Sequence, residues 1–502
     1  MVRAADGPAQ GPAVSGGPRQ DDDWPSTSRV LPWLLAGFLG MLWFVPIDSV
    51  VVEISLPVDA TADRVALFAL TAIALAYTAA AARGTGLRFR SGPPDQAFIA
   101  FVVVSILSVL LSASTLAGLG ELDPAVKRVG VLLIYAIFFY VAAALVRPSE
   151  VPRFAALVVG FAAVTAVGVI YEYRTGANVF FEWSDMLLPS GVDVIPEPED
   201  PQWGRELING PTEHAIAAAT MFSMALPFAV MGLLRSEETR HKVLYGIATG
   251  LILGASFATI RKTGALGMAT GLLVLFLYRP RAMLRLIPLG LVVILVIQFG
   301  APGAVTRVKA QFFGGNLTDE NSTAAGRTRD YQPVSPDLLE HPVIGRGHGS
   351  YTPEKYRYLD NEYLQRLVET GIVGAVAYLL VVLALVLTAH RTTRSRDPAR
   401  SATAIAIVAA AAVYAVTNAT YDQLSFPQAP YLLLFFGALA VVLRDAERKP
   451  DGRDAVVEGD DHATVLTPRW QTSANPARLS RPQRAAPHRA PRAGRGRAEA
   501  PA

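Results

Sequence analysis

A succession of long apolar runs constrains this chain more than any other feature. A transmembrane helix needs about 20 apolar residues, and each run reaches or approaches that length. The runs 243–260 and 263–278 are also compatible with one hairpin or a re-entrant pair. The sequence predicts an all-α integral membrane protein with about 12 transmembrane helices. The candidate spans are 30–47, 65–82, 96–114, 128–146, 153–171, 214–234, 243–260, 263–278, 284–301, 368–389, 402–420 and 427–443.

The composition fits a membrane protein. Hydrophobic residues make up 52% of the 502 residues and charged residues only 17%, and the charges gather in loops and tails. The chain contains no cysteine, which excludes disulfides, thiol chemistry and thiolate metal sites. The net charge of +3 is less informative than the placement of the cations, because basic loops tend to stay in the cytoplasm.

The loop charges predict the orientation of the chain. With the N-terminus inside, the outer loops 48–63 and 172–213 are mostly acidic, and the large loop 302–367 between the ninth and tenth helices is also outside. Both termini are then cytoplasmic, in a multi-pass membrane protein. The inner loops hold Arg83, Arg88, Arg90, Arg147, Arg153, Arg235, Arg240, Lys242, Arg279, Arg281, Arg285, Arg391, Arg394, Arg396 and Arg400.

Both ends of the chain differ from the middle. Residues 1–28 are rich in Gly, Pro, Ala, Ser and Asp and lack an apolar period, so they predict a disordered cytoplasmic arm rather than a signal peptide. Residues 445–502 are rich in Arg, Pro and Ala and predict a disordered cytoplasmic tail. The polytopic membrane domain is expected to occupy residues 29–444.

Ionisable side chains are nearly absent from the middles of the candidate spans. Ion-coupled transporters and proton relays need such groups at depth, so the sequence argues against that class. A lipid flippase with a mildly polar groove remains compatible. The charges instead cluster in the outer loops, which is the arrangement expected of an enzyme that acts at the outer surface on a lipid-anchored substrate.

Two groups of cations stand at the outer ends of spans. Arg205 and His214 precede the sixth span, where outward-facing backbone N–H groups form an anion site that Thr212 would cap. Arg205 either clamps a phosphate or pairs with an acid of its own loop. Arg261 and Lys262 occupy a short outer loop, against the positive-inside trend. They either bind an anion or reflect simple tolerance of two charges.

The most polar stretch of the chain is 326–374. It contains Arg327, Arg329 and the segment HPVIGRGHGSY, whose glycines allow a tight turn or the close approach of a ligand. No βαβ unit surrounds these glycines, so they do not form a dinucleotide fingerprint. A short helix is expected at 336–341, and a polar helix start then runs into the tenth span, in which Gly371 and Gly374 would permit close helix packing.

These motifs resemble the O-antigen ligase and polymerase superfamily of bacterial polysaccharide membrane proteins. The spacing of Asn361, Gly371 and Gly374 is similar to the family signature, and HPVIGRGHGSY is similar to its His-Pro-hydrophobic-hydrophobic-Gly-x-Gly segment. Gly326-Arg327 and the pair Ser256 and Arg261 also fit the family layout. The resemblance covers roughly residues 200–385.

The resemblance implies a metal-independent glycosyltransferase of cell-envelope polysaccharide biosynthesis, with no cofactor. The donor would be a glycan on polyprenyl diphosphate, and the acceptor would be a sugar hydroxyl on another lipid-linked unit or a different anchor. The lipid bilayer is a partner, a flippase or chain-length regulator would be protein partners, and no nucleic acid is expected. The substrate-binding candidates are Arg205, His214, Arg261, Lys262, Arg327, Arg329 and Asn361.

The chain departs from the ligase pattern at the expected base. That pattern has His immediately before the Asn, whereas this chain has Asp360. Asp360 is therefore either the base that accepts the hydroxyl proton or a helix N-cap. His341 and His348 are further catalytic candidates, with loop packing as the alternative role. His214 is another possible substitute for the missing histidine base. The departure favours a polymerase or another branch over a lipopolysaccharide ligase. A transporter or flippase and a non-catalytic scaffold of envelope assembly are the competing functions.

Overall fold

The computed structural model describes residues 30–52, 60–80, 89–187, 192–195, 208–300, 303, 306, 334–353 and 355–448. The predicted N-terminal arm lies outside these residues, as do Arg205, Arg327 and Arg329. Most of the predicted C-terminal tail also lies outside them. The last helix continues to Arg448, so the tail does not begin at 445 as expected.

Every apolar run coincides with a helix. These helices are α1 (Val30–Phe44), α2 (Ala62–Ala80), α3 (Pro93–Leu111), α5 (Leu122–Leu145), α6 (Val151–Thr175), α8 (Ala215–Arg235), α9 (Thr239–Ala258), α10 (Lys262–Tyr278), α12 (Ile287–Gly300), α15 (Glu362–Thr392), α16 (Pro398–Thr417) and α17 (Gln428–Arg448). Within the described residues, nine helices are long and apolar enough to cross a membrane, and α1 and α10 are shorter apolar helices. A mostly helical, multi-pass protein is thus confirmed, whereas the number of about 12 spans stays a prediction.

Short elements connect the long helices. They are α4 (Ala113–Leu119), the 3₁₀ turn η2 (Pro148–Glu150), α7 (Val179–Leu187), α11 (Pro280–Arg285), a helix at 334–340 and the 3₁₀ turn η4 (Gln423–Ser425). The helix at 334–340 matches the one expected near 336–341. A turn at 259–261 separates α9 from α10, and Ile260 in the turn has a φ of 53°.

Two short strands depart from the expected all-helical fold. Strand β1 (Val50–Val52) pairs antiparallel with β2 (Val192–Val194), with Val51 opposite Asp193. The Glu213 N–H also donates to Asp48 Oδ2 at 2.9 Å. These contacts join the loops 48–63 and 172–213, so both loops lie on the same side of the bundle of helices. The charge pattern predicted this shared side, and which side of the membrane it faces stays a prediction.

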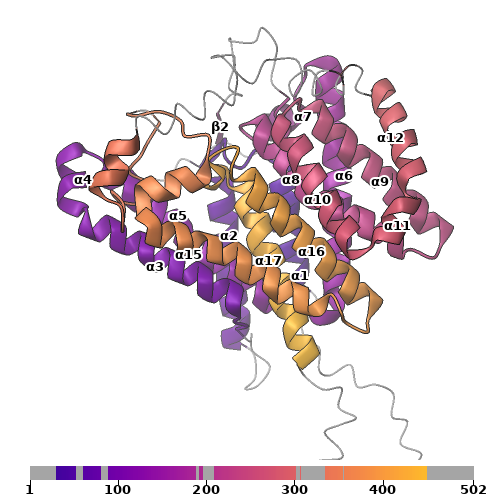
Figure 1. Cartoon of the computed structure of the whole chain (residues 1–502), viewed down its shortest axis with the longest axis horizontal. Coiled ribbons are helices and arrows are strands. Elements are labelled where there is room, and N and C mark those ends of the chain that lie inside the picture. Colours follow the sequence, from indigo (N-terminus) through magenta and orange to yellow (C-terminus); the bar gives the residue numbers. More distant parts are fainter. Residues whose placement is uncertain are drawn as a thin grey trace, which may run out of the picture. The chain divides into compact units, whose positions relative to one another are not determined.

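The centre of the fold consists of α8, α16 and α17, whose side chains are the most buried of the long helices. The Tyr431 ring of α17 packs edge-on against Phe138 of α5 at 4.9 Å and Phe38 of α1 at 5.4 Å between centroids. Its hydroxyl donates to Asp63 of α2 at 2.7 Å, which satisfies a buried carboxylate. Helix α15 lies alongside α3, and α10 packs with α8 and α16 (Figure 1).

Candidate functional site

Helix α15 is interrupted at Gly371, and a segment of the large loop repairs the break. Gly371 has φ 64° and ψ −169°, which no continuing helix adopts. The Arg346 and Gly347 N–H groups donate to the carbonyls of residues 368 and 369 at 3.1 and 2.9 Å. On the other side of the break, the Ile372 and Val373 N–H groups donate to the carbonyls of residues 342 and 343 at 3.0 and 3.2 Å. Segment 342–347 therefore replaces the hydrogen bonds that the interruption removes.

Glycine is required where these two backbones touch. A Cβ at Gly345 would lie 2.4 Å from the carbonyl carbon of Glu369, and one at Gly371 would lie 2.3 Å from that of Val343. Both residues also have positive φ. Gly371 thus permits close approach, as expected, but its neighbour is the loop backbone rather than a second helix. The prediction of helix packing at Gly371 was wrong because it assumed that the helix was continuous.

We call the junction of segment 342–347 with the interrupted helix α15 the Gly371 splice. Just beyond this splice, His348 is buried among charged groups. Its backbone N–H donates to Ser108 Oγ at 3.0 Å, and its ring packs edge-on against Phe101. Arg366 donates to His348 Nδ1 at 2.6 Å, which leaves the ring proton on Nε2. Burial, and then the positive charges of Arg366 and Arg128, hold the pKa of His348 well below its usual range. The imidazole is consequently neutral.

Arg366 lies between two buried carboxylates of its own helix. Its Nε lies 2.7 Å from Glu362, and a terminal nitrogen lies 2.9 Å from Glu369. The spacing i, i+4 and i+7 places Glu362, Arg366 and Glu369 on one face of α15. Glu362 also accepts a hydrogen bond from the Leu424 N–H at 2.9 Å, and Glu369 from the Gln365 side chain at 3.3 Å. The two carboxylates therefore neutralise the charge of Arg366.

A recess opens beside these residues, and we call it the His348 recess. It encloses about 280 Å³, including the part open to solvent. Arg128 of α5 lines it, half-buried, and donates to the Ser425 hydroxyl at 2.9 Å. In the part of the chain that the structure describes, no carboxylate forms an ion pair with Arg128, so its charge is available to an anion. The recess is lined by Arg128, Val131, Leu132, Tyr135, His348, Gly349, Arg366, Glu369 and Leu424.

Asp422 lies near this recess with a perturbed carboxyl group. Burial and the negative charge of Glu362 raise its pKa to about 7, while Ser425 and Arg128 act in the opposite direction. The side chain is nevertheless partly accessible. A carboxyl group that titrates near neutrality can both accept and release a proton, which is the property expected of a general base.

A second charged group, the Arg346 cluster, lies on the other side of the same loop. It consists of Arg346, Glu121, Asp337, Lys355 and Tyr356. Arg346 pairs with Glu121 at 2.9 Å and with Asp337 at 3.1 Å, and Lys355 lies 2.6 Å from Glu121. Tyr356 hydrogen-bonds to both Arg346 and Glu121.

The charges of the Arg346 cluster balance one another. Burial disfavours the charge of Glu121, but the hydrogen bonds from Lys355 and Tyr356 and the charge of Arg346 lower its pKa below the usual value. Glu121 precedes α5, whereas Arg346 and Lys355 belong to the large loop. The cluster therefore fastens the loop to the start of α5.

The other described candidates lie at helix ends. His214 is the N-cap of α8 and accepts from the Ile216 N–H at 3.2 Å, so the cap is not Thr212, whose hydroxyl donates to a carbonyl of its own turn. Asn361 is the N-cap of α15, so the cap considered for Asp360 belongs to its neighbour. Asp360 and His341 are exposed.

Segment 418–426, between α16 and α17, connects several of these helix ends. Phe426 lies 5.9 Å from the His214 ring, and Thr420 accepts from Thr263 at 3.0 Å, beside the half-buried Arg261 and Lys262. The Glu362 N–H donates to the Asn418 carbonyl at 2.8 Å. The structure thus arranges His214, Arg261 and Asn361 around one segment, but among the residues that it describes none of them lines the His348 recess.

Several residues of this site were not predicted from the sequence. The spacing of Glu362, Arg366 and Glu369 in the polar helix start was a readable signal of one charged face. Arg128 also lies at the outer end of a predicted span. That position, which drew attention to Arg261, was a weaker indication of a functional role for Arg128. Within the described residues, no group of three or more His, Asp or Glu side chains is placed to hold a metal ion.

The comparisons with known proteins agree with the motifs. Residues 247–379 match the Wzy_C family model, which is described as O-antigen ligase. The matched region runs from within α9 to within α15, so it includes Arg261, His348, Arg366 and both sides of the Gly371 splice. This match confirms the resemblance to the O-antigen ligase and polymerase superfamily. No curated protein matches the chain.

Proposed function

We propose that this chain, which carries an O-antigen ligase region of the Wzy_C type, transfers a polyprenyl-diphosphate-linked glycan to a sugar hydroxyl outside the bacterial plasma membrane. The product would be a cell-surface polysaccharide, made by a polymerase or a ligase. The observation that supports the proposal is the His348 recess. Arg128 lines it and forms no ion pair with a carboxylate among the described residues, and Asp422, whose pKa is about 7, lies near it.

The arginines would serve the leaving group. As the glycosidic bond breaks, negative charge develops on the diphosphate, and cations that are already fixed in place stabilise it without reorganisation. Arg128 is held by Ser425, and no carboxylate among the described residues forms an ion pair with it. Arg205, Arg261, Lys262, Arg327 and Arg329 remain candidates for the same role. Because Nδ1 of His214 already accepts from the Ile216 N–H, His214 would bind the diphosphate by donating from Nε2.

The acceptor hydroxyl needs a group that accepts its proton. Asp360, His341 and His348 are the candidates from the sequence, and the structure adds Asp422. Since Nδ1 of His348 already accepts from Arg366, a positioning role suits His348 better than proton transfer. Asn361 would bind substrate in addition to capping α15. Protonation of Asp422 by the incoming hydroxyl would leave the oxygen nucleophilic toward the anomeric carbon.

Neither a metal nor a cofactor is required by this chemistry, because arginines can provide the positive charge.

The position of the charges favours an enzyme over a flippase. A flippase needs a polar groove through the spans, whereas the charged groups described above lie at the helix ends and in the loops between them. Flippase and chain-length regulator proteins would act beside this chain rather than being replaced by it.

The proposal is tested by glycan extension in cells that depend on this chain. The variants Arg261→Ala, Arg327→Ala and Asp360→Asn should each abolish extension while protein levels remain unchanged. Arg153→Ala is the control, because this exposed arginine lies at the start of α6, away from the outer loops. Normal extension in all three variants would contradict a catalytic role for these residues and favour a scaffold.

A further inference from the structure

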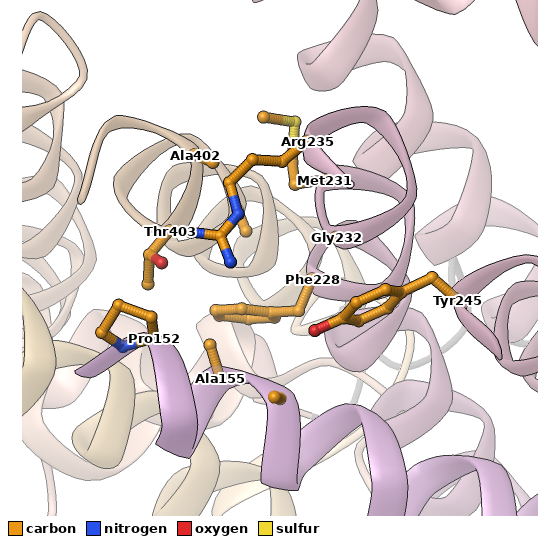
Figure 2. Close-up of a pocket in the computed structure, with 11 residues that line it drawn as sticks. Pro152, Ala155, Phe228, Met231, Gly232, Arg235, Tyr245, Ala402 and Thr403 are labelled. Atoms are coloured by element: carbon orange, nitrogen blue, oxygen red, sulfur yellow. The ribbon is translucent and has the colours of Figure 1, made fainter. Parts of the chain in front are cut away.

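A second recess lies at the opposite ends of the helices, and we call it the Arg235 recess. Arg235 is the last residue of α8, a helix of 21 residues that begins directly after His214. At 1.5 Å per residue these ends are about 30 Å apart, the thickness of a bilayer core. Helices α6, α8, α9 and α16 supply the lining, which consists of Pro152, Ala155, Ala156, Phe228, Met231, Gly232, Arg235, Tyr245, Ala402, Thr403 and Ala406 (Figure 2).

The lining combines apolar walls with one cation. Figure 2 shows the Arg235 guanidinium reaching into the recess toward the Phe228 ring, with the hydroxyls of Tyr245 and Thr403 on either side. None of the described residues that line the recess is acidic. Arg235 makes no ion pair or hydrogen bond with any other residue that the structure describes. An arginine in this position offers a planar fork of donors that matches a phosphate group.

One wall of the recess depends on a missing side chain. A Cβ at Gly232 would lie 2.3 Å from Cε1 of Tyr245, so glycine allows the Tyr245 ring to lie directly against α8. The ring closes the side of the recess that faces α9. The shape is therefore set by the packing of α8 on α9 rather than by a mobile side chain.

The surroundings fit a lipid. Val243, Leu244 and Ile247 of α9, next to Tyr245 in the helix, are 53–55% exposed, which provides an apolar surface for an acyl chain. The loops at these helix ends hold Arg153, Arg240, Lys242 and Arg400, and the loop after Arg235 also holds Glu237 and Glu238. Basic pockets between transmembrane helices on the cytoplasmic side attract anionic headgroups.

We infer that the Arg235 recess binds the phosphate of an anionic glycerophospholipid, with one acyl chain lying along the exposed face of α9. The phosphate accepts hydrogen bonds from the Arg235 guanidinium and from the Tyr245 hydroxyl, whereas the Thr403 hydroxyl already donates to the Ala399 carbonyl at 2.9 Å. This site is separate from the glycan-transfer site, so it stands whether or not the proposed transferase activity is confirmed.

The test measures lipid binding to the purified full-length protein by native mass spectrometry. Phosphatidylglycerol is titrated against phosphatidylcholine of the same chain length. We expect one phosphatidylglycerol to bind with at least 10-fold preference. Arg235→Gln should weaken its binding about 10-fold, which corresponds to the loss of one charge-assisted interaction. Ala155→Leu, which keeps the charge but fills the recess, should weaken binding to a similar degree. The readout needs no glycan substrate.

Arg240→Gln is the matched control, because it removes an exposed cation at the same helix ends but outside the recess. An equal loss of binding with Arg240→Gln would overturn the inference in favour of general surface charge. Unchanged binding with both Arg235→Gln and Ala155→Leu would also overturn it. Inorganic phosphate is not expected to compete, and competition at concentrations near those of the lipid would overturn the lipid assignment.

Discussion

The two charged groups at the large loop contrast in how their charge is balanced. In the Arg346 cluster, one arginine faces Glu121 and Asp337, and a lysine and a tyrosine complete the network. In the His348 recess, Arg366 is neutralised by two glutamates, but Arg128 meets only a hydroxyl among the described residues. A balanced cluster holds parts of the chain together, whereas an unbalanced cation beside a cavity can bind something else.

The comparison predicts its largest effect at Arg346. Arg346→Met would leave Glu121 and Asp337 without their main cation, so we expect a loss of about 3 kcal/mol in the free energy of unfolding. Thermal unfolding of the purified protein in detergent measures this loss. The molecules that remain folded should retain most of their specific activity. A stable but inactive Arg346→Met protein would show that this cluster belongs to the active site.

Arg128 should show the reverse behaviour. Removing one preorganised cation from the developing charge typically costs about 100-fold or more in rate, so Arg128→Ala should reduce glycan extension to that degree. The unfolding temperature should fall less than in Arg346→Met, because Arg128 hydrogen-bonds to the neutral Ser425 hydroxyl and no carboxylate among the described residues forms an ion pair with it. Arg128→Lys should restore part of the activity. Lys127→Ala is a neighbouring control and should extend glycans normally.

Gly371 tests whether the splice positions the recess. Gly371→Ala combines a residue with positive φ and a Cβ that would lie 2.3 Å from the Val343 carbonyl carbon. We expect destabilisation of about 2 kcal/mol and a fall in activity, because segment 342–350 carries His348. Thermal unfolding and glycan extension, measured on the same preparation, report both effects. Gly246→Ala in α9, where no atom lies within 4 Å of the added Cβ, should be neutral.

The smallest expected effect is a pH dependence from Asp422. With a pKa of about 7, its ionised fraction rises from about one tenth at pH 6 to about nine tenths at pH 8. If ionised Asp422 takes the proton from the hydroxyl of the acceptor sugar, the rate of glycan extension should rise up to about 10-fold over this interval and then level off. Extension in permeable membrane vesicles measures the profile.

Asp422→Asn should be slow and should lose the pH dependence, whereas an unchanged profile would assign the base to another residue. The stability effect has the opposite sign. Because the pKa is higher in the folded protein than in the unfolded chain, this group costs stability as the pH rises from about 4 to about 7. Its contribution is most favourable below the unfolded pKa.

The sequence was sufficient for the helices because burial in lipid depends on local composition. Each apolar run became a helix, and the loop charges correctly grouped 48–63 with 172–213. The strands β1 and β2 were missed because each has only three residues and pairs with a distant partner. Short apolar segments of that length carry no readable period.

The site was predicted only where its signal was local. The glycine segment and the helix start at residues 361–374 stood out as motifs, and the structure joins them. The pairing of Arg128 with Ser425, and the position of Asp422 near both, depends on contacts between residues almost 300 positions apart. Such convergence comes from tertiary packing. The break at Gly371 was hidden as well, because its replacement hydrogen bonds come from another segment.

The splice at Gly371 has a consequence for exchanging parts between related proteins. Segments 342–347 and 368–373 share four backbone hydrogen bonds and two points of contact that only glycine allows. They therefore behave as one exchangeable module, although some 20 residues of chain separate them. A chimera that replaces the large loop but keeps the native helix would lose the donors and acceptors that close the break. A chimera that receives both segments from the same protein would keep the hydrogen bonds that close the break.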